Sequence, residues 1–251
     1  MIEINNIDKS FGDTQVLYDV SFKFEQGKTN LIIGQSGSGK SVLTKCIVGL
    51  HTPEKGNIFY DGIDFLAMKT SEKKAIRKEI GMLFQGGALF DSLTVIENVM
   101  FPLKMFTKMS KAEMMERANF CLERVNIVNK NNLFPSEISG GMQKRVAIAR
   151  AIAMKPKYLF CDEPNSGLDP LTAILIDNLI REITEEYNMT TVVITHDMNS
   201  VLEIGDKIMF IYEGHNHWTG DKDSIVSTSN KEVNEFVYSS KFLKLFKEKM
   251  K

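Results

Sequence analysis

The sequence predicts an α/β fold, in which helices surround a β-sheet core and a helical segment is inserted into the middle of the chain. Strand-like and helix-like patterns alternate over residues 1–84 and again over residues 156–212, which is typical of an α/β sheet core. The stretch between them, residues 86–153, carries its apolar residues mostly at helical spacing. We therefore expect one domain over residues 1–223, with a helical subdomain at about 86–153, and a separate tail over residues 224–251.

Composition and charge exclude several classes of protein. The 251 residues are 43% hydrophobic and 25% charged, which is ordinary for a globular protein. The formal net charge of −1 gives no general attraction to nucleic acid, so no nucleic-acid partner is expected. No apolar run reaches the length of a membrane span, and the N-terminus lacks the pattern of a signal peptide. Cys46, Cys121 and Cys161 lie far apart in apolar patterns, which predicts buried free thiols in a reducing cytoplasm.

The most specific motif begins at Gly34 and matches the pattern G-x4-G-K-[ST] at every fixed position. It lies between a short apolar run, Thr29–Ile33, and an apolar stripe typical of a helix, which is the context that this motif requires. Its backbone N–H groups can wrap around a phosphate chain, Lys40 can reach the β- and γ-phosphates, and the Ser41 hydroxyl can bind Mg²⁺. The loop predicts a nucleoside triphosphate site. Its residues are Gly34, Gln35, Ser36, Gly37, Ser38, Gly39, Lys40 and Ser41, and the stripe after it comprises Val42, Leu43, Cys46, Ile47 and Leu50.

A second apolar run, Tyr158–Cys161, ends at two carboxylates, Asp162 and Glu163. An apolar strand that ends in acids places them at the edge of a sheet, so we expect them beside the phosphate-binding loop. Asp162 can hold Mg²⁺ through water, and Glu163 suits a general base or a group that positions water. If the phosphate-binding loop were absent, we would interpret Asp162 and Glu163 simply as the polar end of a strand.

A second anion-binding pattern lies in residues 138–152. Ser139 is a suitable N-cap, and Gly140 and Gly141 expose backbone N–H groups at the start of a long helix. One nucleotide does not need two such loops from one chain. We therefore expect a head-to-tail dimer in which Ser139 and Gly141 of one chain cover the γ-phosphate held by the other.

Two further patterns support the helical segment in the middle of the chain. Residues Lys111–Val125 carry apolar side chains at helical spacing with charged side chains between them. Thr94–Glu97 fits a capping box before a further apolar stretch that begins near Val99.

These motifs, in this order, resemble those of the ATP-binding cassette (ABC) ATPases over essentially residues 1–220. The resemblance implies a P-loop ABC ATPase fold with a RecA-like sheet core, an antiparallel β subdomain and an inserted helical subdomain. It identifies residues 34–41 with the Walker A loop, Asp162 and Glu163 with the Walker B pair, and residues 139–142 with the signature loop.

The resemblance also implies roles for residues outside these motifs. Phe11 would stack on adenine, and Gln85 would sense Mg²⁺ and the attacking water. Asp169, in the loop Ser166–Asp169, would contact the partner chain. His196, after the β-branched run Thr190–Thr195, would contact the γ-phosphate, although alone it would as often be a structural histidine. The family pattern implies two further ATP contacts, Val16 and Thr44.

The sequence departs from the family pattern at two positions. Met142 stands where Gln usually follows the signature glycines, so a glutamine contact with the nucleotide is not expected there. Phe11 stands where Tyr is commoner, which should matter little because stacking needs only the face of the ring.

The implied mechanism uses ATP and Mg²⁺. Two ATP molecules clamp the dimer, with Mg²⁺ held by Ser41, Gln85 and Asp162. Glu163 orients water in line with the γ-phosphate, while Mg²⁺ and Lys40 spread the developing charge. Loss of the γ-phosphate then opens the dimer. The catalytic set is Glu163, His196, Gln85 and Lys40.

The lone cassette, with no membrane span and no coiled-coil insertion, is expected to act as a homodimer on two separate multi-span permease subunits. Residues 85–103 contain the pattern Gly-Ala-Leu-Phe-Asp-Ser-Leu-Thr-Val, which resembles the ATPases of Mla-type, MCE-associated lipid transporters, and Met142 fits the same group. This resemblance implies phospholipid as the cargo and an MCE-domain lipid-binding protein as a further partner. It also implies a peripheral location on the cytoplasmic side of the inner membrane.

Leu89 and Phe90 lie in that pattern. Exposed apolar side chains are unfavourable, so we expect both to cover a coupling helix of the permease. The alternative is that both pack inside the helical subdomain.

The tail is predicted to be helical and basic at its end. It has three interpretations: it lies on anionic lipid, it docks on a neighbouring subunit, or it presents a solvated lysine face. Its resemblance to the extension of Mla-type ATPases implies a crossing to the partner ATPase. One helical face would carry Val233, Phe236, Val237, Ser240 and Leu243.

His215 and His217 lack a third ligand nearby. They are expected to lie in a turn after the strand Lys207–Tyr212 rather than to bind a metal ion.

Two other functions stay open. The first is a soluble ABC ATPase that serves an assembly or regulatory module, for example in iron–sulfur cluster assembly. The second is the ATPase of a transporter for another solute.

Overall fold

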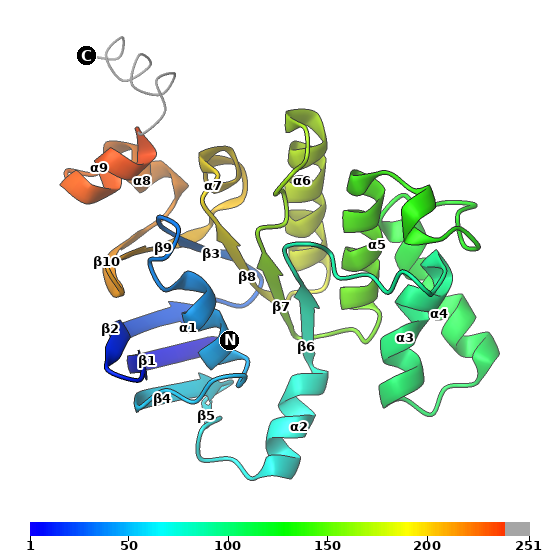
Figure 1. Cartoon of the computed structure of the whole chain (residues 1–251), viewed down its shortest axis with the longest axis horizontal. Coiled ribbons are helices and arrows are strands. Elements are labelled where there is room, and N and C mark those ends of the chain that lie inside the picture. The colour runs from blue at the N-terminus through cyan, green and yellow to red at the C-terminus, as the bar shows by residue number, and fades with distance from the viewer. Residues whose placement is uncertain (239–251) are drawn as a thin grey trace. The chain divides into compact units, whose positions relative to one another are not determined.

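The computed structural model describes residues 1–238 and divides into two compact units (Figure 1). Among the described residues, the terminal unit comprises residues 1–68 and 194–238, and the middle unit comprises residues 69–193. The middle unit is longer than the helical subdomain expected at about 86–153, because it also contains strands on both sides of that segment and the helices beside them. Within residues 1–238, no helix combines the length and the apolar character needed to cross a membrane.

The terminal unit contains an antiparallel sheet, as expected. Its four strands are β1 (Ile2–Phe11), β2 (Thr14–Phe24), β4 (Lys55–Tyr60) and β5 (Ile63–Asp64), in the spatial order β2-β1-β4-β5. Every pair is antiparallel, and alternate residues of β1 are buried, which is the pattern of a sheet with one face on a core.

The strand before the phosphate-binding loop is β3 (Thr29–Ile33), whose bounds match the prediction. It is buried along its whole length and pairs in parallel with β9 (Lys207–Tyr212), which pairs antiparallel with β10 (His215–Gly220). β8 (Thr190–Thr195) also has its predicted bounds and contains the boundary between the units. The helices of the terminal unit are α1 (Lys40–Ile47), α7 (Met198–Ile204), α8 (Lys222–Ser227) and α9 (Lys231–Val237).

The middle unit pairs β6 (Ile80–Leu83) in parallel with β7 (Tyr158–Asp162). The predicted capping box at Thr94 is confirmed, because the Thr94 hydroxyl accepts from the Glu97 N–H and the Glu97 carboxylate accepts from the Thr94 N–H. Its helices are α2 (Thr70–Lys78), α3 (Val95–Phe106), α4 (Lys111–Arg124), the 3₁₀ turn η1 (Pro135–Glu137), α5 (Gly140–Ile152) and α6 (Pro170–Glu186).

The predicted apolar stripe after the phosphate-binding loop is wrong at its end. α1 ends at Ile47, and Leu50 is 62% exposed instead of facing the core. The reason is local, because Gly49 adopts a left-handed conformation (φ 76°) and the Leu50 N–H bonds back to the Lys45 carbonyl at 2.8 Å. The turn redirects the chain before the stripe is complete.

The three cysteines are buried free thiols, as predicted. Burial raises the pKa of Cys46 and of Cys121 to about 11 and also raises the pKa of Cys161. All three are therefore neutral, inert groups of the core.

The apolar face of the tail packs within its own unit over the part that the structure describes. Val233 and Val237 of α9 are buried, and the Phe236 ring lies 5.3 Å from the Phe210 ring of β9. This packing corrects the expectation that the first part of the face is free for lipid or for a neighbouring subunit. Ser240, Leu243 and the terminal lysines lie outside the described residues.

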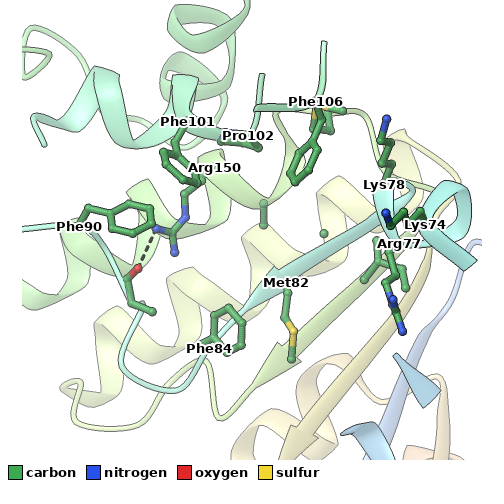
Figure 2. A pocket seen from close by; sticks show the side chains of 15 residues that line it. Lys74, Arg77, Lys78, Met82, Phe84, Phe90, Phe101, Pro102, Phe106 and Arg150 are labelled. Carbon is green, nitrogen blue, oxygen red and sulfur yellow. Dashed lines mark hydrogen bonds between the residues drawn. The ribbon is translucent and has the colours of Figure 1, made fainter. Parts of the chain in front are cut away.

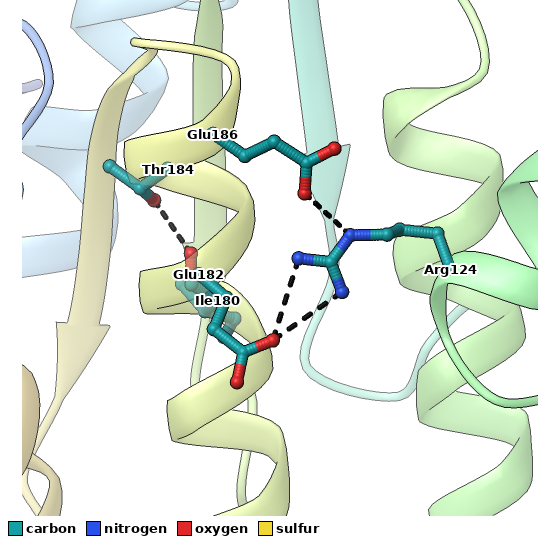
Figure 3. A network of polar contacts seen from close by, with 5 residues as sticks. All are labelled: Arg124, Ile180, Glu182, Thr184 and Glu186. Carbon is teal, nitrogen blue, oxygen red and sulfur yellow. Dashed lines mark hydrogen bonds and ion pairs between the residues drawn. The ribbon is translucent and has the colours of Figure 1, made fainter.

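Helices α4 and α6 are joined by an ion-pair network (Figure 3). The Arg124 Nε donates to Glu186 at 2.6 Å, and both terminal nitrogens of Arg124 lie 3.4 Å from Glu182. Beneath these pairs, the buried Thr184 hydroxyl donates to the Ile180 carbonyl at 2.7 Å. The pairs are partly exposed, so they fix the orientation of α4 more than they stabilise the fold.

Replacing Phe236 by Ala is expected to lower the free energy of unfolding by about 3 kcal/mol, because the change removes a buried ring from the contact with Phe210. Urea unfolding of the full chain measures this change. Val226→Ala, at an exposed position of α8, is the matched control and should change the midpoint little. Equal midpoints for the Phe236 variant and the parent would show that α9 does not contribute to the core.

Candidate functional site

The phosphate-binding loop leaves its backbone N–H groups available at the start of α1. Gly39 precedes the helix with φ 106° and offers no side-chain cap, so the first-turn donors have no partner from a capping side chain. The Ser38 hydroxyl is also buried without a hydrogen-bond partner among the described residues. Unsatisfied donors at a helix N-terminus suit a polyanion, so the loop fits the phosphates of a nucleotide.

Lys40 brings a positive charge into this loop. Its side chain is buried, and its ammonium donates to the Gly34 carbonyl at 2.9 Å and to the Gln35 carbonyl at 2.8 Å. These carbonyls hold the charge where phosphate oxygens would lie. Gln35, Ser36, Gly37 and Ser41 are exposed on the loop, which leaves the Ser41 hydroxyl accessible for a metal ion.

Val16 lies beside the phosphate-binding loop, whereas Thr44 lies within the helix that follows it. A side chain at Gly39 would meet the Leu17 side chain at 2.7 Å and the Val16 carbonyl at 3.3 Å, so β2 lies against the loop and Val16 is beside it. Thr44 is buried in α1, and its hydroxyl donates to the Lys40 carbonyl at 3.1 Å. Thr44 therefore supports the helix that carries Lys40.

Two predicted nucleotide contacts lie at exposed ends of strands in the terminal unit. Phe11 ends β1 and His196 directly follows β8, and both are exposed. Asp197 caps α7 immediately after His196, because its carboxylate accepts from the Asn199 N–H at 2.9 Å. The cap fixes the chain direction after His196.

In the middle unit, Gln85 follows β6 with its side chain exposed and its backbone held by a lysine. The Lys144 ammonium of α5 donates to the Gln85 carbonyl. Burial lowers the pKa of Lys144, while the nearby Cys161, Asp162 and Glu163 act in the opposite direction. The ammonium thus lies near the predicted sensor glutamine, near Asp162, the predicted Mg²⁺ ligand, and near Glu163, the predicted catalytic carboxylate.

The loop that follows Gln85 is fixed by two more polar side chains. The Arg150 guanidinium of α5 donates to the Gly87 carbonyl at 2.7 Å and to the Ala88 carbonyl at 2.8 Å. Asn98 of α3 is fully buried, accepts from the Phe90 N–H at 2.8 Å and donates to three carbonyls of the same loop. The segment after Gln85 is therefore built by contacts from α3 and α5.

Asp162 ends β7 and Glu163 follows it, as predicted, and both are half-buried. Glu163 has φ 48°, a conformation that a residue with a side chain seldom adopts. The Glu163 carbonyl accepts from the Ser166 N–H at 3.2 Å, which starts the tight turn toward α6. The backbone therefore turns sharply at the residue predicted to position water.

The structure brings the predicted signature loop and Asp169 together. Ser139 caps α5 as expected, with its hydroxyl accepting from the Met142 N–H at 3.3 Å. Gly141 approaches α6 so closely that an added side chain would lie 2.7 Å from Thr172. A hollow of about 330 Å³ lies between these segments, lined by residues that include Ser139, Gly140, Gly141, Met142, Gly167, Leu168 and Asp169.

Asp169 also has a structural role. Its carboxylate accepts from the Thr172 N–H at 3.0 Å and from the Thr172 hydroxyl at 2.5 Å, which caps α6. The side-chain hydrogen bond from Thr172 lowers the pKa of Asp169, so the cap is charged at neutral pH.

A larger hollow of about 780 Å³ lies beside the Gln85 loop, between α2, β6, α3 and α5 (Figure 2). Phe90 stays 42% exposed at this hollow, although its ring lies 4.5 Å from Phe101 and the Arg150 guanidinium lies over it. Leu89 is half-buried. The pair thus packs partly within the helical subdomain, and its contact with a permease stays a prediction. The other lining residues include Met82, Phe84, Phe106, Ala151 and Met154, and Lys74, Arg77 and Lys78 of α2 form one wall.

Sequence patterns did not identify Lys144, Arg150, Asn98 or His51. The first three contact the Gln85 loop, and His51 contacts Phe11. Each is an isolated polar residue in or after a helix, and only the folded chain shows what it contacts. His215 and His217 lie on β10, which corrects the expectation that they lie in a turn. On this strand, His215 stacks on Tyr18 and His217 pairs with Glu232 at 3.1 Å.

Comparison with known proteins agrees with this geometry. Residues 17–166 match the family model described as ABC transporter. The probable ribonucleotide transport ATP-binding protein mkl of Mycobacterium tuberculosis is 35% identical over 94% of this chain, and the chain spans 66% of the length of that relative. The methionine import ATP-binding protein MetN of Campylobacter jejuni is 39% identical to this chain. The matched region covers 97% of this chain and 77% of the length of MetN.

Solved structures give the same result. The ATP-binding cassette MJ0796, in a dimeric post-hydrolysis state with ADP and Pi, has a TM-score of 0.80 and 33% identity, covering 88% of this chain and 99% of that one. CbiO1 of Clostridium perfringens, part of the ABC transporter complex cbiONQ, has a TM-score of 0.85 and 27% identity, covering 98% of both chains. The chain described here belongs to the ABC transporter family and is an ATPase cassette of that family.

Proposed function

We propose that the chain hydrolyses ATP to drive a membrane transporter, working as a homodimer on two permease subunits at the cytoplasmic side of the inner membrane. The observation that carries this proposal is the phosphate-binding loop with its uncapped helix and buried Lys40. The family match and the cassette dimer of the neighbour MJ0796 support it.

Within this function, the loop residues 34–41 bind the phosphates, with Val16 and Thr44 beside and beneath them, and Phe11 stacks on adenine. Glu163 positions the attacking water, and His196 contacts the γ-phosphate. Ser41, Gln85 and Asp162 offer the oxygen ligands that Mg²⁺ prefers, and Mg²⁺ would supply charge neutralisation at the phosphates. Lys40 stabilises the charge that develops on the γ-phosphate.

The hollow of the signature loop supports the dimer. Ser139, Gly140, Gly141 and Met142 lie with Asp169 at one accessible surface, and α5 begins there with exposed backbone donors. This surface suits the γ-phosphate of an ATP molecule held by a second copy of the chain. Asp169, already bound to Thr172, would contact that copy through the backbone of its loop.

The hollow beside the Gln85 loop suits a permease segment. Its floor is apolar and aromatic, and one wall carries the cations Lys74, Arg77 and Lys78. Such a surface fits an amphipathic helix whose apolar face packs on Phe90 and Phe106 and whose acidic residues face α2.

For the cargo, we propose a phospholipid or another envelope lipid, delivered with an MCE-domain partner. The support is the sequence pattern of residues 87–95 and Met142, which resembles Mla-type ATPases. A second candidate is a polar solute, which the printed names of mkl and MetN favour, since one is named for ribonucleotide transport and the other for methionine import.

Glu163→Gln is expected to bind ATP yet hydrolyse it at least a hundredfold more slowly, because the amide cannot accept a proton from the attacking water. ATPase assays and size-exclusion chromatography with ATP should show slow turnover and a trapped dimer. Glu185→Gln, on the exposed face of α6, is the matched control and should keep the parent rate. Fast turnover by the Glu163 variant would remove this residue from its proposed role.

Lys74→Glu combined with Lys78→Glu is expected to weaken binding of the permease while ATP binding by the isolated chain stays unchanged. The reason is that reversed charges would repel the acidic side of the docked helix. Co-purification of tagged chain from its native membranes measures the association. The pair Lys111→Glu and Lys130→Glu, both exposed and outside the hollow, makes the same charge change elsewhere. Equal recovery with both pairs would show that α2 does not face the permease.

The cargo is tested by gentle-detergent purification of the tagged parent chain from its native membranes, with mass spectrometry of co-purifying proteins and lipids. We expect a multi-span permease, an MCE-domain protein and bound phospholipid. A permease with a substrate-binding protein for a polar solute would instead support the second candidate. Recovery of soluble partners alone would overturn the transport function.

A further inference from the structure

The Phe11 ring has two neighbours that no motif contains. The ring is 46% exposed at the end of β1. The Lys9 ammonium lies 5.1 Å from its centroid, and the His51 ring lies 5.3 Å away at an interplanar angle of 77°. A half-exposed ring held by an ammonium and an imidazole is more strongly oriented than its exposure alone suggests.

Lys9 fixes the segment that carries His51. The Lys9 side chain is buried, and its ammonium donates to the Thr52 carbonyl at 2.9 Å and to the Glu54 carboxylate at 2.5 Å. The other Glu54 oxygen accepts from the Ser10 N–H at 2.7 Å. The hydrogen bond from Lys9 lowers the pKa of Glu54, so the Glu54 carboxylate is charged at neutral pH. Residues 51–54 are therefore fastened to the end of β1, beside Phe11.

His51 is also tied to the helix of the phosphate-binding loop. Its backbone N–H donates to the Lys45 carbonyl at 3.0 Å, near the end of α1. One residue thus contacts both the helix that begins at Lys40 and the ring proposed to stack on adenine. Both contacts lie within the terminal unit.

We propose that His51 is a positioning residue of the nucleotide site, which holds the Phe11 ring in a fixed orientation before the base arrives. This inference rests on the proposed stacking of Phe11 on adenine. Without His51, the ring would have a wider choice of rotamers, and nucleotide binding would have to restrict it. Lys9 and Glu54 keep the segment of His51 in place, so the position of the ring is set before ATP binds.

His51→Ala is expected to raise the Kd for MgATP about threefold to tenfold, the range that corresponds to loss of one perpendicular ring pair. Titration calorimetry with the full chain measures Kd, and steady-state assays should place the change in KM rather than in kcat. His51→Phe keeps a ring at this position and should restore binding. Leu50→Ala, at the exposed neighbouring position, is the matched control.

A double-mutant cycle separates positioning from direct contact. If His51 acts through Phe11, His51→Ala should add nothing in a Phe11→Ala background. The same fold-change in both backgrounds, or an unchanged Kd for His51→Ala alone, would overturn the inference. An unchanged Kd for Phe11→Ala would overturn the stacking role of Phe11 together with it. A weakened Phe11→Ala beside an unaffected His51→Ala would remove only the role of His51.

Discussion

The phosphate-binding loop of the terminal unit depends on one constraint: a buried ammonium must be stable at the start of a helix that has no side-chain cap. Gly34, Gly37 and Gly39 all have positive φ, which lets the loop curl tightly between β3 and α1. The Lys40 charge is compensated by the Gly34 and Gln35 carbonyls. A buried cation favours a nearby anion, so the contacts that hold Lys40 in this loop also suit the loop to the phosphates proposed to bind there.

The middle unit contains a second buried ammonium with a different setting. Lys144 donates to the Gln85 carbonyl and lies near Asp162 and Glu163, which oppose the effect of burial on its pKa. Two carboxylates at a strand end repel each other, and a nearby cation offsets that repulsion. Lys144 thus places a cation near both acids while it holds the backbone of Gln85, the proposed sensor glutamine.

The sequence predicted the strands and the cap positions well. β3, β8 and β9 have the expected bounds, β7 extends one residue beyond the expected run, and the caps at Thr94 and Ser139 are present. These signals depend on a few neighbouring residues. The side chains that hold Gln85 and Phe11 were not predicted. Lys144, Arg150 and His51 act across long sequence separations, for which one sequence carries no local pattern. The prediction that Leu50 belongs to the buried apolar stripe was wrong for a local reason. The left-handed conformation of Gly49 ends the helical course of the chain, so the helical periodicity does not extend to Leu50.

Helix α5 connects the separate features of the middle unit. Its first turn is capped by Ser139 of the signature loop, Lys144 follows with its bond to Gln85, and Arg150 near its end binds the Gly87 and Ala88 carbonyls. Arg150 and Ala151 also line the hollow proposed for the permease segment. Residues that the proposals use thus lie near both ends of one helix, Ser139 at its N-cap and Arg150 in its last turn. Helix α5 therefore carries residues of the proposed signature loop, of the contact with the proposed sensor glutamine, and of the hollow proposed for the permease segment.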